Sequence, residues 1–198
     1  SKYLKNEILD LTEDNFVLVT CHRRENILNE YSFKKIISLL NNIENSNVIF
    51  PMGYKTQEIL NKSGILLNNN VKVLDPIGYL EFMFLLKNSK FVATDSGTVV
   101  EEACILNVPS IQMRYSTERP EVYDVKASIK FDPTKSSTNN EDILSSVNNL
   151  KRGWDNPFGD GNSSELIVSD LIELSKTNNF KKHNPSDYSF DTSRSFKE

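Results

Sequence analysis

A regular alternation of short apolar segments with helical segments most constrains how this chain can fold. Residues 16–20 form a β-branched apolar run typical of a buried strand, and residues 31–43 carry apolar side chains at helical spacing. The alternation recurs, with strand-like residues 48–50, 71–74, 91–94 and 109–113 and helix-like residues 56–61, 79–87 and 99–106. Repeated strand–helix units predict a parallel sheet covered on both faces, a doubly wound, Rossmann-like α/β fold.

The rest of the chain extends this pattern and then departs from it. Residues 128–131 are expected to form one more strand, and residues 140–150 and 163–175 to form helices. From Lys176 onward the chain is polar. We therefore expect one domain over residues 1–176 and a polar carboxyl-terminal tail over residues 177–198, loosely held by its composition.

Composition excludes several classes of protein. The 198 residues include 23 Lys and Arg against 27 Asp and Glu, a net charge of −4, which argues against a nucleic-acid partner. No apolar run approaches the roughly 18–20 residues of a membrane span, and the first residues lack the apolar region of a secretory signal. Cys21 and Cys104 provide no disulfide framework, and no Cys/His spacing indicates a metal site. A cytoplasmic protein with reduced thiols is expected.

Polar clusters follow three of the expected strands, at residues 20–26, 94–102 and 114–121. In a doubly wound sheet, ligands bind at the carboxyl ends of strands. In the second cluster, Ser96 and Gly97 open a helix, whose unpaired N–H groups and positive dipole end suit a phosphate or diphosphate. The following carboxylates, Glu101 and Glu102, suit the hydroxyls of a ribose. Alternatively, Asp95 or Ser96 only caps the helix and the two glutamates favour its dipole.

The other two clusters supply positive charge. Pro120 restricts Arg119, which is then suited to binding a phosphate with two hydrogen bonds; alternatively, Arg119 pairs with Glu118 or Glu121 at the surface. His22, beside Arg23, is either a ligand or acid near a diphosphate or a structural histidine. The chain has neither a Gly-x-Gly-x-x-Gly nor a Walker motif, so NAD and ATP are poor candidates.

Five short stretches together resemble the non-hydrolysing UDP-N-acetylglucosamine 2-epimerases and their UDP-sugar 2-epimerase relatives. The stretches are TCHRREN at 20–26, PIGYLEF at 76–82, TDSG at 94–97 with Glu101, Glu102 and Ala103, TERPE at 117–121 and NPFGDG at 156–161. They occur in the family's order over residues 16–175. The resemblance implies the carboxyl-terminal half of a two-domain enzyme of GT-B architecture, with the amino-terminal half missing here and the full-length parent a homodimer.

The resemblance also implies roles for individual residues. Phe82 would stack on the uracil ring, and Glu102 would bind the ribose hydroxyls. Ser96 and Gly97 would hold the diphosphate, and Arg119 would contact it. His22 would act in catalysis, and the supporting residues would be Arg23, Glu101 and Glu118. By pattern alone, Phe82 is better interpreted as a core residue, because it shares an apolar face with Leu86. Thr98 and Val100 depart from the family pattern, where glycine and glutamine are commonest.

The reaction implied by the resemblance needs no metal or redox cofactor. UDP is eliminated from a UDP-HexNAc substrate to give a 2-acetamidoglycal, then adds back with C2 inverted, in sugar-nucleotide synthesis for surface polysaccharide. The fragment alone is expected to be inactive. Two alternatives are the donor-binding half of a GT-B glycosyltransferase and a non-catalytic UDP-sugar-binding domain. Residues 22–26 and 118–121 favour the epimerase over the glycosyltransferase.

Overall fold

Six parallel strands form one sheet in the order β3-β2-β1-β4-β5-β6. The strands are β1 Phe16–Thr20, β2 Asn47–Pro51, β3 Val71–Leu74, β4 Val92–Thr94, β5 Ser110–Met113 and β6 Ser128–Phe131. The structure is a computed structural model that describes residues 6–12 and 15–177. Leu18 of β1 is in register with Ile49 on one side and Val92 on the other, so the order reverses between β1 and β4. The predicted doubly wound parallel sheet is confirmed.

Eight helices in the described part of the first 156 residues connect and flank these strands. They are α1 Asn6–Asp10, α2 Arg24–Ile27, α3 Glu30–Asn41, α4 Tyr54–Ser63, α5 Tyr79–Asn88, α6 Gly97–Ile105, α7 Glu121–Asp124 and α8 Asn140–Asn148. The longer helices fall where apolar periodicity predicts them. The short helices α1, α2 and α7 were not predicted, because four or five residues are too few to show a helical period.

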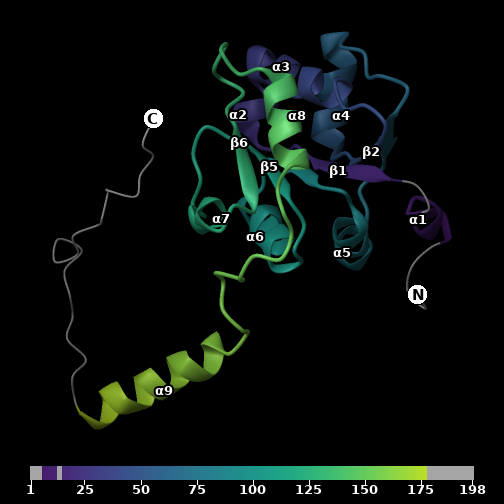
Figure 1. The fold of residues 1–198 in the computed structure, drawn as a ribbon. Coiled ribbons are helices and arrows are strands. Elements are labelled where there is room, and N and C mark those ends of the chain that lie inside the picture. Colours follow the sequence, from purple (N-terminus) through teal and green to yellow (C-terminus); the bar gives the residue numbers. More distant parts are fainter. Residues whose placement is uncertain (1–5, 13–14, 178–198) are drawn as a thin grey trace. The chain divides into compact units, whose positions relative to one another are not determined.

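Two apolar cores lie on opposite faces of the sheet. Val17 and Val19 of β1 pack with buried residues of α3 and α8, whereas Phe16 and Leu18 pack with those of α5 and α6. Figure 1 shows α3, α4 and α8 on one side of the strands and α5 and α6 on the other. Alternate strand side chains point to opposite faces, and each fully buried Leu or Phe contributes about 1.5–3 kcal/mol. Burial on both faces explains why the inner strands β1 and β2 contain continuous apolar runs.

The chain divides into two units, Ser1–Asn156 and Pro157–Glu198. The second unit contains helix α9, Ser163–Lys176, where the sequence predicted a helix. The expected tail begins at Thr177, and its residues 178–198 lie outside the described residues.

Candidate functional site

Asp95 is the organising residue at the point where the strand order reverses. It follows β4 and its side chain is fully buried. Its carboxylate accepts hydrogen bonds from the backbone N–H groups of His22, at 3.1 and 3.2 Å, and Arg23, at 2.9 Å, and from Asn26 Nδ2 at 3.1 Å. Asp95 therefore holds the loop after β1 against the loop after β4. We call this edge of the sheet, with the loops that follow β1, β4 and β5, the carboxyl edge.

Helix α6 begins at this edge. Ser96 Oγ accepts a hydrogen bond from Val99 N at 3.4 Å, so Ser96, not Asp95, is its amino-terminal cap. A Cβ atom on Gly97 would lie 3.2 Å from Glu118 Oε2, so glycine leaves room for the Glu118 carboxylate at the start of the helix. The capping interpretation of Ser96 is confirmed. It is compatible with an anion site, because the dipole of the nine-residue helix still places positive potential there.

Arg119 lies beside this helix start but does not pair as the surface alternative predicted. Its Nε donates to Glu101 Oε2 at 2.6 Å, and its Nη1 donates to the backbone oxygen of Glu118 at 3.0 Å. The contact with Glu101 raises the pKa of Arg119. The side chain is 40% exposed, and its Nη2 makes no hydrogen bond to the residues that the structure describes. The Nη2 atom of Arg119 is therefore a donor available to solvent or to a ligand.

Arg114 is a buried cation that sequence reasoning did not select. It directly follows β5 and is only 7% exposed. Its Nη1 donates to Glu118 Oε2 at 2.8 Å, and its Nη2 lies 3.6 Å from Glu25 Oε1. Arg114 lowers the pKa of the Glu118 carboxyl. The sequence feature that could have identified Arg114 is its position directly after an apolar strand. An arginine that is buried at such a position needs charged partners.

The adjacent carboxylates of Glu101 and Glu102 have different partners. Glu101 pairs with Arg119, whereas Glu102 Oε1 accepts a hydrogen bond from the hydroxyl of Tyr79 at 3.0 Å. That contact raises the pKa of Tyr79. Tyr79 is the first residue of α5, and it too was absent from the predicted site.

Phe82 borders a small cavity at the carboxyl edge. The cavity has a volume of about 300 Å³ and is lined by Thr20, Cys21, His22, Pro51, Gly53, Phe82 and Val99. Phe82 also packs against the α5–α6 core, which confirms the core interpretation of this residue. The His22 ring is 57% exposed, with Nδ1 3.4 Å from Asp95 Oδ1. Burial, with a smaller contribution from Asp95, raises the pKa of Cys21 and keeps its thiol protonated.

The structure therefore brings the predicted residues to one edge in four groups. His22 and Phe82 line the cavity, and Ser96, Gly97 and Glu118 meet at the start of α6. Glu101 pairs with Arg119, and Glu102 bonds Tyr79. Arg23 contributes its backbone amide to Asp95. Among residues 6–12 and 15–177, no group of three or more His, Cys, Asp or Glu side chains is arranged to hold a metal ion. Over the same ranges, no helix has the length and apolarity to cross a membrane.

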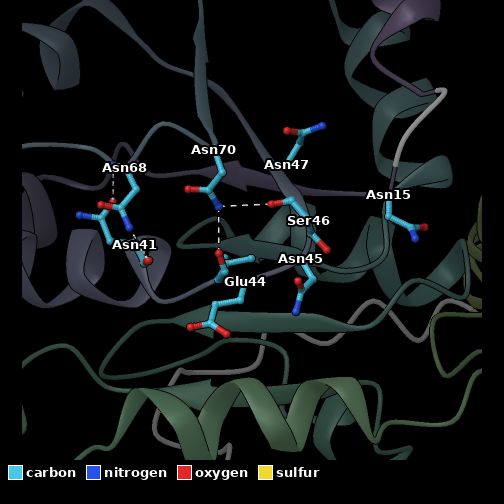
Figure 2. A pocket seen from close by; sticks show the side chains of 9 residues that line it. Asn15, Asn41, Glu44, Asn45, Ser46, Asn47, Asn68 and Asn70 are labelled. Atoms are coloured by element: carbon cyan, nitrogen blue, oxygen red, sulfur yellow. Dashed lines mark hydrogen bonds between the residues drawn. The ribbon is translucent and has the colours of Figure 1, made fainter.

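A larger hollow of about 760 Å³ lies at the opposite, amino edge of the sheet. Figure 2 shows most of its lining, which consists of Asn15, Asn41, Ile43, Glu44, Asn45, Ser46, Asn47, Asn68 and Asn70. Several of these amides already bond the backbone. Asn41 donates to Leu66 O, Asn68 to Asn41 O, and Asn70 to the backbone oxygens of Ile43 and Ser46. These asparagines brace the loops before β2 and β3.

The sheet order and the three convergent loops define a Rossmann-like α/β domain with its polar residues at the strand-order switch point. Residues 1–172 match the family model described as UDP-N-acetylglucosamine 2-epimerase, so the chain belongs to that family. It is 42% identical over 179 residues to the UDP-N-acetylglucosamine 2-epimerase of Methanococcus maripaludis, an alignment covering 85% of this chain and 46% of that protein.

The solved structures agree with this assignment. The Methanocaldococcus jannaschii UDP-GlcNAc 2-epimerase in complex with UDP-GlcNAc and UDP superposes with a TM-score of 0.73 and 36% identity, covering 87% of this chain and 49% of that one. The glycosyltransferase of kitacinnamycin superposes with a TM-score of 0.50 at 13% identity, covering 82% and 40%, which shows a shared fold only. This chain spans about half the length of the relatives that it matches.

Proposed function

We propose that this chain is the nucleotide-binding half of a UDP-N-acetylglucosamine 2-epimerase, and that its carboxyl edge binds the UDP portion of a UDP-HexNAc substrate. The observation that carries the proposal is the convergence of the loops after β1, β4 and β5 at the switch point, where Asp95 joins the first two. Ligands of doubly wound sheets bind at this position. Family membership and the complex of a relative with UDP-GlcNAc and UDP support the same assignment.

Each part of UDP has a chemically suitable neighbour at this edge. The start of α6 and the Nη2 atom of Arg119 suit the diphosphate, because both present N–H donors and positive charge. Glu102 suits the ribose hydroxyls. The cavity beside Phe82, at about 300 Å³, is at the lower end of the roughly 300–1,000 Å³ typical of ligand pockets, and offers an aromatic face to the uracil.

In the proposed reaction, a proton leaves C2 of the sugar and the C1–O bond breaks, with its electron pair going to UDP. The resulting 2-acetamidoglycal regains UDP at C1 and a proton on the opposite face of C2. The task of this half is to stabilise the charge that develops on UDP and to retain it for re-addition. His22, at the cavity wall, is the residue we place beside the diphosphate and sugar. We assign proton transfer at C2 to carboxylates of an amino-terminal half.

The proposal extends to the whole protein. We place it in the cytoplasm as a homodimer that needs neither a metal nor a redox cofactor, and we assign its product to sugar-nucleotide supply for surface polysaccharide. Protein carrying both halves should incorporate deuterium at C2 when it epimerises UDP-N-acetylglucosamine in D2O, whereas this chain alone should show no turnover. Sugar transfer to an acceptor without C2 exchange would contradict the epimerase and favour a glycosyltransferase.

Binding is tested on this chain by calorimetric titration with UDP, with uridine and inorganic phosphate as weaker-binding comparisons. Arg119→Ala should weaken UDP binding about tenfold or more, because hydrogen bonds to charged groups are worth about 1.5–3 kcal/mol. Arg152→Ala is the matched control, since Arg152 donates to Ser89 O and Lys90 O at the amino edge. Equal loss of binding in both variants, or no UDP binding at all, would contradict the placement.

A further inference from the structure

We propose that Tyr79 is a specificity-determining residue, and that its hydroxyl and the Glu102 carboxylate together recognise the 2′,3′-diol of a ribonucleoside diphosphate. The inference rests on the proposed function and deepens it. It predicts that the site selects UDP over 2′-deoxy-UDP and that Tyr79 provides part of this selectivity.

Tyr79 is exposed but has a defined position. The residue is 64% exposed, so core packing does not explain an aromatic ring at this place. The start of α5 is fixed locally, because Glu81 Oε2 accepts a hydrogen bond from Gly78 N at 2.9 Å and Gly78 O accepts one from Phe82 N at 2.9 Å. Helices α5 and α6 also pack on the same face of the sheet, through residues such as Leu85 and Ala103. The hydroxyl is therefore presented to Glu102 from a rigid element.

The hydrogen bond between Tyr79 and Glu102 uses only part of the hydrogen-bonding capacity of the two side chains. The Tyr79 hydroxyl donates its proton to Glu102 Oε1, and Glu102 Oε2 accepts no hydrogen bond from the residues that the structure describes. Glu102 Oε2 and the lone pairs of the phenol oxygen therefore remain as two neighbouring acceptors. The raised pKa of Tyr79 agrees with a hydroxyl that keeps its proton beside a carboxylate.

A vicinal diol complements this arrangement. A ribose offers two O–H donors on adjacent carbons, one for Glu102 Oε2 and one for the phenol oxygen. A 2′-deoxyribose offers one donor, so one of the two acceptors loses its partner in the ligand. Glu101 does not provide the same recognition, because its Oε2 is bound to Arg119.

The test is a calorimetric titration of this chain with UDP and with 2′-deoxy-UDP. The unmodified chain should prefer UDP about tenfold or more. Tyr79→Phe should lower UDP affinity several-fold and leave 2′-deoxy-UDP affinity unchanged, so the preference falls. Glu102→Gln should also reduce the preference. Tyr31→Phe, on α3 on the other sheet face, is the matched control and should keep it.

The outcomes separate this inference from the proposed function. If the unmodified chain prefers UDP and Tyr79→Phe keeps the same UDP to 2′-deoxy-UDP ratio, the inference is wrong and the proposed function stands. If the unmodified chain binds both nucleotides equally, the inference is also wrong. If it binds neither nucleotide, both proposals fail. Circular dichroism and the unfolding midpoint of Tyr79→Phe, expected to match the unmodified chain because the ring is exposed, exclude loss of fold as the cause of a lower ratio.

Discussion

The two edges of the sheet both carry hollows, but the hollows differ in size, in polarity and in what the nearby side chains already bond. The amino edge has the larger hollow, about 760 Å³, lined mostly by asparagines, of which Asn41, Asn68 and Asn70 bond loop backbone (Figure 2). The cavity at the carboxyl edge is only about 300 Å³, yet this edge carries His22, Arg119, the start of α6 and the buried Asp95. The site that we propose is therefore not at the larger hollow.

The physical difference is how polar groups are used. At the amino edge, Asn41 and Asn70 satisfy carbonyl groups that the loops before β2 and β3 would otherwise leave unpaired. At the carboxyl edge, parallel strands end and helices begin, so helix N–H groups and charged side chains collect on the same side. An edge with available N–H donors and positive charge is suited to an anionic ligand. An edge whose asparagine side chains bond backbone carbonyl groups is suited to stabilising its loops.

The largest expected effect on stability comes from Asp95. Asp95→Ala removes the acceptor for His22 N, Arg23 N and Asn26 Nδ2, and each unsatisfied donor costs about 1–3 kcal/mol. The free energy of unfolding should fall by about 3–5 kcal/mol in urea denaturation. Asn70→Ala at the amino edge should lose only about 1 kcal/mol. Equal losses in the two variants would remove the distinction between the edges.

A smaller effect separates a helix cap within the site from a cap outside it. Ser96→Ala removes the cap of α6 and should cost about 1 kcal/mol of stability together with a measurable part of UDP affinity. Asn29 caps α3, because its Oδ1 accepts a hydrogen bond from Ser32 N at 3.1 Å. Asn29→Ala should therefore cost a similar amount of stability without changing UDP affinity. Unfolding curves and titrations on both variants measure this difference. A Ser96→Ala protein with full UDP affinity would place the diphosphate elsewhere.

The smallest effect is a pH dependence from Glu118. Its hydrogen bond with Arg114 lowers the pKa of the carboxyl below 4.5, so the folded state binds this proton less readily than the unfolded state. The stabilisation is present above the unfolded pKa and is lost as the pH falls through the lowered folded pKa. As the pH falls below about 5, the unfolding free energy of the unmodified chain should fall more steeply than that of Glu118→Gln.

The effect is small because the Glu118 side chain is 57% exposed and solvent screens the pair. Glu44→Gln, the same substitution at the amino edge, is the matched control for Glu118→Gln. Parallel pH profiles for the unmodified chain and Glu118→Gln would show that Arg114 and Glu118 do not couple measurably to folding.

Local patterns were enough to predict much of the fold and part of the candidate site. The strands were predictable because burial on both faces requires continuous apolar residues, as in residues 16–20. The start of α6 was predictable because a serine and a glycine follow a strand and precede a helical period. The short helices α2 and α7 were not predictable, since four residues carry no periodic signal.

The residue pattern was enough to predict the strands, the longer helices, the parallel class of the sheet and the polar residues that follow its strands. The partners of these residues depend on the tertiary structure. Asp95 holds residues about 70 positions away, Arg119 pairs with the carboxylate of Glu101 and not with that of Glu118 or Glu121, and Tyr79 bonds Glu102. The reason is that helical and strand periods depend on neighbouring residues, whereas these pairs depend on which strands lie side by side. The placement of β4 next to β1 brings two distant loops together, and no local pattern records that placement.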